Sequence, residues 1–234
     1  MEIHKPKPFH NLKEFGSEIL TIVVGILIAL GLEQAIEAIH RNERRQIAVE
    51  MIEKEIRTNI GEAVSVSKVV DCSKRQMTAL TDALGRGDQK AAAKVLRYGH
   101  FHIYGVWLDA AWTNNLSSGT LDGIDDEKRL GYSIFYAMVR EQHVQQERIA
   151  SALDRLEALT GTGMASSQQA IEAELPQAAE LAGALREYYN IGFGLQASPK
   201  ALLGITLSRG ELDSRPHRNE EAACESAAKA LVAG

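Results

Sequence analysis

Proline, cysteine and aromatic residues are scarce in this chain, and each shortage excludes a class of protein. Five prolines among 234 residues leave long stretches without a helix breaker, while alanine, leucine, glutamate and glutamine are abundant. Two cysteines are too few for a disulfide framework or a four-ligand zinc site. No long run alternates polar and apolar residues, as a sheet would require. The composition therefore predicts an all-α fold.

Positive charge is not in excess. The chain carries 26 lysines and arginines against 31 aspartates and glutamates, which gives a net charge of -5. Nucleic-acid binding depends largely on a basic surface that neutralises phosphates, so this balance gives no support to a nucleic-acid partner.

Signatures of common catalytic and cofactor sites are also missing from the sequence. There is no glycine-rich phosphate loop, no haem-attachment motif, no zinc-protease motif and no nucleophile elbow. His100 and His102 would lie on one face of an extended segment, and Asp109 could join them, but a metal site needs three or four ligands. We expect no cofactor, no metal and no catalytic residue, and these three side chains are only weak metal candidates.

The two cysteines, Cys72 and Cys224, lie far apart in the sequence. They would form one disulfide if the domain is periplasmic. Two unrelated buried thiols are the simpler expectation, because free cysteine behaves as a small buried apolar residue.

What the chain does contain is an apolar run near its N-terminus. Fourteen uncharged residues, Ile19 to Leu32, lie between Glu18 and Glu33. As a helix they rise about 21 Å, less than the hydrocarbon core of about 30 Å, whereas residues 15–36 rise about 33 Å. The run has no proline and no polar face, and cations flank it on both sides. It predicts an uncleaved transmembrane helix.

Two alternatives remain for this run. A cleaved signal peptide would be processed near Ala29-Leu30-Gly31, although the helical pattern continues through Ile36 without a turn residue. A buried core helix of a soluble protein would have a similar length.

One face of the predicted transmembrane helix carries small residues. Steps of four, three, four and four residues place the following side chains on that face: Glu18, Ile22, Gly25, Ala29 and Glu33. Gly25 and Ala29 form a small-xxx-small pair, which lets two membrane helices approach closely. We expect a protein partner or a second copy of the chain to pack here, within the lipid bilayer.

The helical pattern continues past the apolar run. Apolar residues keep a spacing of three and four from Ile52 to Leu84, and the glycines of "GRGD" then end the pattern. The predicted organisation is a cytoplasmic head (1–14), a transmembrane helix (15–36), a helical domain (37–214) and a flexible or loosely helical tail (215–234). Three cations on each side leave orientation undecided, but the short head suits retention in the cytoplasm, with the helical domain in the periplasm.

Further helices are predicted in the second half of the chain. Asp125 is a candidate N-cap for a long helix that ends near Leu159, with Leu130 and Ile134 on its apolar side. The middle of that helix, "REQHVQQER", is almost wholly polar, which predicts projection into water, with a polar seam or cavity as the alternative. Pro176 predicts the first turn of another helix. The two long helices are expected to form an antiparallel hairpin capped by shorter helices.

Aromatic residues gather in one region. The members of this group are Tyr98, Phe101, Tyr104, Trp107 and Trp112. They could line a ligand pocket, but packing between short helices explains them more simply.

The first 45 residues contain "MEIHKPKP", followed by "FGSEILTIVVGILIALGLEQAIE" and a charged helix. They resemble a group of bacterial single-pass membrane proteins of unknown function, found notably among alphaproteobacteria. These share a short basic head and a helix of the form E-(I/L)-x-x-I-V-x-G-(I/V)-L-I-A-L, which residues 18–34 match. A looser likeness covers Ala111-Trp112 and "LSSGTL". The resemblance implies a helical protein that crosses the membrane once, and it brings no catalytic residues.

These observations lead to one expected function and one alternative. We expect a membrane-anchored helical scaffold or accessory subunit that acts through protein–protein contacts at the bacterial inner membrane. The alternative is a periplasmic sensor or ligand-binding domain that signals through a partner, because the head is too short to be an output domain.

Overall fold

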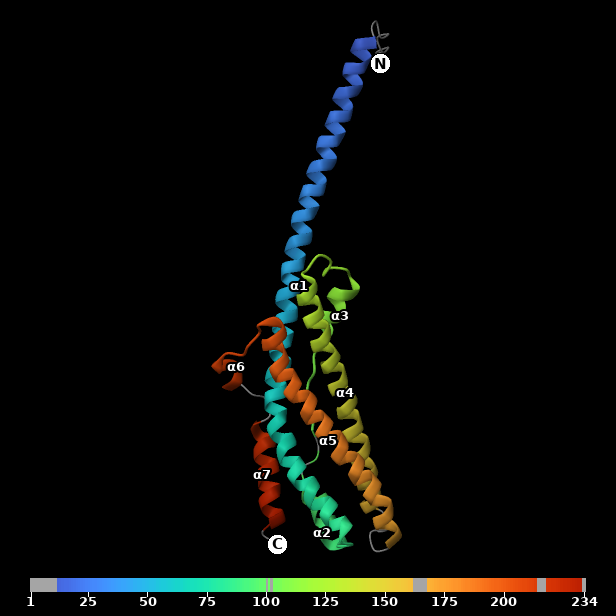
Figure 1. The fold of residues 1–234 in the computed structure, drawn as a ribbon, viewed down its shortest axis with the longest axis vertical. Coiled ribbons are helices and arrows are strands. Elements are labelled where there is room, and N and C mark those ends of the chain that lie inside the picture. Colours follow the sequence, from blue (N-terminus) through green and yellow to red (C-terminus); the bar gives the residue numbers. More distant parts are fainter. Residues whose placement is uncertain (1–11, 100, 102, 162–167, 214–217, 233–234) are drawn as a thin grey trace, which may run out of the picture. The chain divides into compact units, whose positions relative to one another are not determined.

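A computed structural model of the chain describes residues 12–99, 101, 103–161, 168–213 and 218–232. These residues form seven α-helices and no strand, so the predicted all-α class is confirmed (Figure 1). The helices are α1 (Leu12–Gly85), α2 (Gln89–Tyr98), α3 (Ala110–Ser117), α4 (Asp126–Gly161), α5 (Gln168–Leu203), α6 (Arg209–Asp213) and α7 (Arg218–Val232). The chain divides into two compact units, Met1–Ala48 and Val49–Gly234, and each is described here by itself.

The first unit consists, over its described residues, of the N-terminal part of α1. The apolar side chains of residues 15–36 are exposed in every direction around the helix; Leu20, Leu27 and Leu32 are 63%, 62% and 62% exposed. In the part of the chain that the structure describes, α1 alone is long and apolar enough to cross a bilayer. No proline interrupts α1, so the predicted continuation of the apolar helix into the following helix is confirmed.

In the second unit, α1 supplies one wall of the core. The predicted apolar face is buried, from Ile52 and Ile56 to Leu84. The helix ends at Gly85, where Gly87 adopts a positive φ of 68° that only glycine accepts readily. The amides of Gly87 and Asp88 close the end by donating to the carbonyls of Leu84 and Ala83 at 3.0 and 2.9 Å.

The antiparallel hairpin is formed by α4 and α5, which lie side by side (Figure 1). The α4 helix runs parallel to α1, since Tyr132 near its start bonds Glu53 and Gln142, further along, lies beside Ala63. The predicted antiparallel pairing of these two helices is therefore wrong. Its cause is the extended segment 103–109, called the strap below, which runs back along α1 before α4 begins. Val106 in this segment bonds Glu62, and the later residue Leu108 bonds Asn59, which is closer to the start of α1.

The α5 helix continues through both of its prolines. Pro176 and Pro199 lie inside α5, so the prediction that a new helix begins at Pro176 is wrong. An interior proline costs a helix about 3 kcal/mol. The helix nevertheless buries Leu181, Leu185 and Tyr188 on one face, and this packing outweighs the local preference.

The buried face of α4 is aromatic at its beginning. Leu130 and Ile134, predicted to face the core, are 61% and 39% exposed. Tyr136 is buried instead, because the ring of Trp112 in α3 stacks on it at 5.4 Å with an interplanar angle of 4°. The expected cap is present, since the Asp125 carboxylate accepts a hydrogen bond from the Lys128 amide at 3.0 Å.

Candidate functional site

Three polar side chains on one face of α1 bind the backbone of the strap and of the α3 helix that follows it. Glu55, Asn59 and Glu62 follow at steps of four and three residues and are all buried; we call them the polar ladder. Glu62 Oε1 accepts from the Val106 amide at 2.7 Å. Asn59 bonds both backbone groups of Leu108: Oδ1 accepts from its amide at 2.8 Å, and Nδ2 donates to its carbonyl at 2.7 Å.

The spacing of the ladder matches the repeat of an extended chain. One helical turn rises about 5.4 Å, and two residues of an extended segment rise about 6.6 Å. Successive turns of α1 can therefore reach alternate residues of the strap, here Val106 and Leu108. The α1 helix thus takes the role that a neighbouring strand would have in a sheet.

The third member of the ladder caps α3. The Glu55 carboxylate accepts from the amides of Ala111 at 2.9 Å and Trp112 at 3.4 Å. Asp109, the residue at the N-cap position, makes no side-chain cap bond, so a carboxylate from α1 supplies the negative charge that a helix N-terminus favours. The Tyr136 hydroxyl also donates to Glu55 Oε1, at 2.7 Å.

The other edge of the strap is held by α4 and α5. Gln146 Oε1 accepts from the Gly105 amide at 2.9 Å and from the Tyr188 hydroxyl at 3.2 Å. The indole of Trp107 donates to the same Tyr188 oxygen at 3.2 Å. Because these groups converge on Gly105, a Cβ at that position would lie 2.5 Å from Trp107 Nε1 and 2.7 Å from Tyr188 Oη.

One face of the polar middle of α4 is a buried seam, although the rest of the stretch is exposed, so this part of the helix packs on its neighbours and does not project past them. This corrects the prediction. Gln142 and Gln145 are buried, and Gln142 Nε2 donates to the Tyr188 carbonyl at 3.0 Å. The run of glutamines in "REQHVQQER" is explained by the strap and by α5, both of which present backbone and hydroxyl groups that need partners. The alternative of a polar seam is therefore the correct one.

Burial changes the ionisation of the groups around the ladder. Burial raises the pKa of Tyr132, Tyr136 and Tyr188 above the usual tyrosine value and is the largest cause at each. The charge of Glu53 raises the pKa of Tyr132 further, and the hydrogen bond to Glu55 raises the pKa of Tyr136 further. At Glu53, partial burial acts to raise the pKa. Bonds from the Lys128 ammonium at 2.7 Å and the Tyr132 hydroxyl at 3.0 Å outweigh it, so the pKa is lowered.

The aromatic group predicted from the sequence does not surround one cavity in the described structure. Phe101, Trp107 and Trp112 are buried, whereas Tyr104 is 58% exposed. Trp107 packs edge-on against Tyr188 at 6.2 Å, while Trp112 packs against the tyrosines of α4. The side chain of Tyr98 lies outside the described part. The three buried members are thus core residues, in agreement with the simpler explanation.

The weak metal candidates are not brought together by described residues. His100 and His102 lie outside the described residues, and Asp109 stands at the N-cap position of α3. Within the described ranges, no three histidine, cysteine, aspartate or glutamate side chains are close enough to hold a metal ion. The expectation of no metal, cofactor or catalytic residue stays a prediction.

The predicted packing face of the apolar helix is open. All five of its residues are exposed; they are Glu18, Ile22, Gly25, Ala29 and Glu33. A Cβ built at Gly25 would meet no described atom within 4 Å. The face is therefore accessible to a second helix, and the packing of such a helix stays a prediction.

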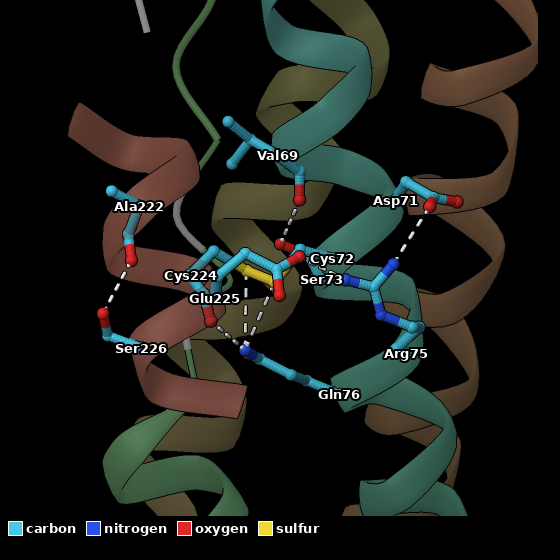
Figure 2. Close-up of a disulfide and its surroundings, with 10 residues drawn as sticks. All are labelled: Val69, Asp71, Cys72, Ser73, Arg75, Gln76, Ala222, Cys224, Glu225 and Ser226. Atoms are coloured by element: carbon cyan, nitrogen blue, oxygen red, sulfur yellow. Dashed lines mark hydrogen bonds and ion pairs between the residues drawn. A yellow bond between two sulfur atoms is a disulfide. The ribbon is translucent and has the colours of Figure 1, made fainter. Parts of the chain in front are cut away.

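Cys72 and Cys224 form a disulfide, so the expectation of two unrelated thiols is wrong (Figure 2). The bond joins α1 to α7 with a Cα–Cα distance of 6.2 Å, across 152 residues of sequence. Next to it, Gln76 Nε2 donates to the Cys224 carbonyl at 3.1 Å, and Arg75 pairs with Glu225 at 2.5 Å. The tail predicted as flexible or loosely helical contains the helix α7 over Arg218–Val232.

One shallow cleft lies between α1 and α5. Its volume is about 210 Å³, and its lining includes Lys74, Thr78, Leu185 and Arg186. Sites for small molecules usually enclose about 300–1,000 Å³ and bury most of the ligand. The Lys74 ammonium is already placed 4.1 Å from the centre of the Tyr189 ring. The cleft therefore gives the ligand-binding alternative little support.

Comparisons of the chain with protein families, with curated proteins and with solved structures give no match.

Proposed function

We propose that this chain is a single-pass membrane protein whose second unit acts as a scaffold or accessory subunit on the periplasmic side of the bacterial inner membrane. One observation carries the proposal: none of the apolar window of α1 near the N-terminus is buried by the rest of the chain. Leaving side chains such as Leu27 in water costs about 1.5–3 kcal/mol each, and a bilayer removes that cost.

The exposure of this window supports a membrane span over a core helix. A core helix of a soluble protein is covered by its own chain, as α1 is covered around Ile52 and Ile56. Residues 19–32 also lack the carboxylate and amide side chains that the buried part of α1 uses to satisfy neighbouring backbone, which suits a lipid environment without polar groups. The resemblance of the first 45 residues to bacterial single-pass proteins points in the same direction.

The disulfide supports a periplasmic location for the second unit. Disulfides persist in oxidising compartments and are rare in the cytosol. Cys72 and Cys224 both belong to the second unit. A cytoplasmic head of about 14 residues followed by a translocated helical unit accounts for both the anchor and the disulfide.

Structural use of the buried polar groups supports a scaffold rather than an enzyme. Glu55, Asn59 and Glu62 are engaged with backbone amides of the strap and of α3, and Gln146 is engaged with Gly105. Carboxylates held in this way serve to fix a chain conformation. A rigid bundle of this kind is suited to holding a partner in place.

Topology and oxidation state test the proposal together. Spheroplasts of cells that express a C-terminally tagged chain are treated with protease, and acid-trapped thiols are then alkylated with a maleimide-linked polymer. We expect the tag to be digested from outside, and we expect no gel shift unless the sample is first reduced. A protected tag with both thiols reactive would place the second unit in the cytoplasm and reject the proposal.

The packing face offers a second test of the same function. Replacing Gly25 with isoleucine puts a branched side chain where close helix approach requires a small residue. We expect Gly25→Ile to reduce the oligomer fraction or partner recovery in mild detergent. The matched control is Gly31→Ile, off the packing face, because Gly31 is likewise in open space. Equal behaviour of both variants and the parent chain would reject packing through this face.

A further inference from the structure

The described part of helix α7 buries few of its side chains. Among its side chains that the structure describes, residues 222–229, Cys224 alone is buried and the rest are exposed or partly exposed. Helices of globular proteins are held mainly by an apolar face packed on the core. Over these eight residues α7 presents no such face, so another contact must hold this part of the helix in place.

The contacts around Cys224 supply that fixation. The disulfide attaches α7 to α1, and the Gln76 amide donates both to the Cys224 carbonyl at 3.1 Å and toward its sulfur at 3.5 Å (Figure 2). The Arg75–Glu225 ion pair is about half exposed on both sides, and such pairs contribute little. Among the described side-chain contacts of α7, the covalent bond is therefore the principal attachment to α1.

We propose that α7 is a latch which oxidation closes and reduction opens. With Cys72 and Cys224 bonded, α7 lies along α1 and next to α2. With both thiols free, α7 leaves this position while the bundle of α1, α4 and α5 stays folded. The latch is independent of the proposed membrane anchor, because every residue it uses lies in the second unit.

The chemistry is an exchange with a dithiol. One thiolate of the dithiol attacks a sulfur of the Cys72–Cys224 bond, the other cysteine leaves as a thiolate and takes up a proton, and a mixed disulfide forms. The second thiol of the reagent then displaces the remaining cysteine, which is protonated in turn. Two electrons pass to the protein, and the dithiol ends as a cyclic disulfide.

Opening the latch uncovers a specific surface of α1. Cys72, Ser73 and Gln76 are buried in the closed form and surround the disulfide (Figure 2). The α2 helix beside α7 loses cover at the same time. In the oxidised form both sulfurs are themselves buried, so reagents reach them slowly and the closed form persists.

Hydrogen exchange of the full chain in detergent tests the latch. Amide exchange is followed by mass spectrometry before and after treatment with dithiothreitol, and intact mass verifies the gain of two hydrogens. We expect exchange in α7 peptides to accelerate about tenfold or more on reduction, while α4 and α5 peptides keep their protection. Cys224→Ser should show the fast α7 exchange without any reductant and should not respond to it.

A matched variant separates the bond from the ion pair. Glu225→Gln removes the salt bridge and keeps the disulfide, and it should change α7 exchange less than twofold. Unchanged α7 protection in both the reduced chain and Cys224→Ser would overturn the latch. Simultaneous loss of protection in α4 and α5 would also overturn it, because the bond would then stabilise the whole bundle.

Discussion

Two stretches of α1 are equally helical and differ in what surrounds their apolar side chains. In residues 19–32 the leucines and isoleucines are exposed, with Leu27 at 62%. In residues 52–84 the apolar face is covered, and Ile52 and Ile56 are fully buried. The covered stretch also carries polar residues among its buried positions, whereas the exposed stretch has no charged residue at all.

The difference is the one expected between a helix that contacts protein and a helix that contacts lipid. A helix inside a protein meets backbone groups of other segments that need partners, and Glu55, Asn59 and Glu62 provide them. Hydrocarbon has no such groups, so a polar side chain there would only be desolvated. Apolar residues interleaved with buried polar residues therefore indicate protein contacts, and a wholly apolar cylinder indicates lipid.

The largest effect is expected from charges in the exposed stretch. Val24→Arg combined with Leu27→Arg places two cations near the bilayer centre, at about 2.5–3.5 kcal/mol each on the insertion scale. We expect the double variant to move from the membrane pellet to the soluble fraction. The control is Leu130→Arg, at a 61% exposed position of the second unit, which should stay in the pellet. Retention of the double variant in the membrane would contradict the assigned span.

The polar ladder should be the next most sensitive feature. Asn59→Leu leaves both the amide and the carbonyl of Leu108 without their partner, and each unpaired buried group costs about 1–3 kcal/mol. We expect a loss of about 2–4 kcal/mol in the free energy of unfolding, measured by urea titration. Thr58→Ala, at the adjacent exposed position, should change it by less than about 0.5 kcal/mol. Equal effects of the two variants would refute the ladder.

Two glycines test the close approach of the strap. In Gly105→Ala the new Cβ would meet Trp107 Nε1 and Tyr188 Oη at 2.5 and 2.7 Å, so we expect a loss of about 1–3 kcal/mol. In Gly61→Ala the Cβ would meet nothing within 4 Å, and helix propensity predicts a gain of up to about 1 kcal/mol. The two unfolding midpoints should therefore move in opposite directions. A stable Gly105→Ala would show that the strap is loosely held.

A smaller, graded effect is expected at alkaline pH. Burial raises the folded-state pKa above the unfolded value of about 10 at three tyrosines, Tyr132, Tyr136 and Tyr188. Their contribution to the free energy of unfolding is therefore complete below about pH 10 and is lost as pH rises above it. Each tyrosine should lower the free energy of unfolding by about 1.4 kcal/mol per pH unit there. Urea titrations from pH 9 to 11.5 measure the slope, which Tyr136→Phe should reduce by about a third. A slope that Tyr136→Phe leaves unchanged would contradict its burial.

Local signals predicted much of the fold. The apolar run predicted the exposed stretch of α1, and the glycines after Leu84 predicted the C-terminal end of α1. Asp125 predicted the start of α4. Each of these features depends on residues within one or two turns, where propensity and capping act directly.

Long-range features were missed or misread. The strap has no sequence periodicity of its own, because α1 and α4 supply its hydrogen-bond partners from distant positions in the chain. For the same reason the glutamines of α4 resemble a solvent-exposed stretch in the sequence, since their partners lie far away in it. The disulfide joins residues 152 positions apart, and two isolated cysteines carry no spacing signal. Pro176 was read locally as a helix start, but packing of the following turns decides the extent of α5.

Alkaline carbonate extraction of membranes that contain the full-length tagged chain, followed by intact mass of the product, tests the anchor most directly. The account predicts full-length protein in the pellet, because residues 15–36 span the bilayer and are not removed. Soluble protein of full mass would contradict it and would require a protein partner to cover the apolar stretch. Soluble protein shortened near Gly31 would contradict it as well, by showing that the stretch is a cleaved signal.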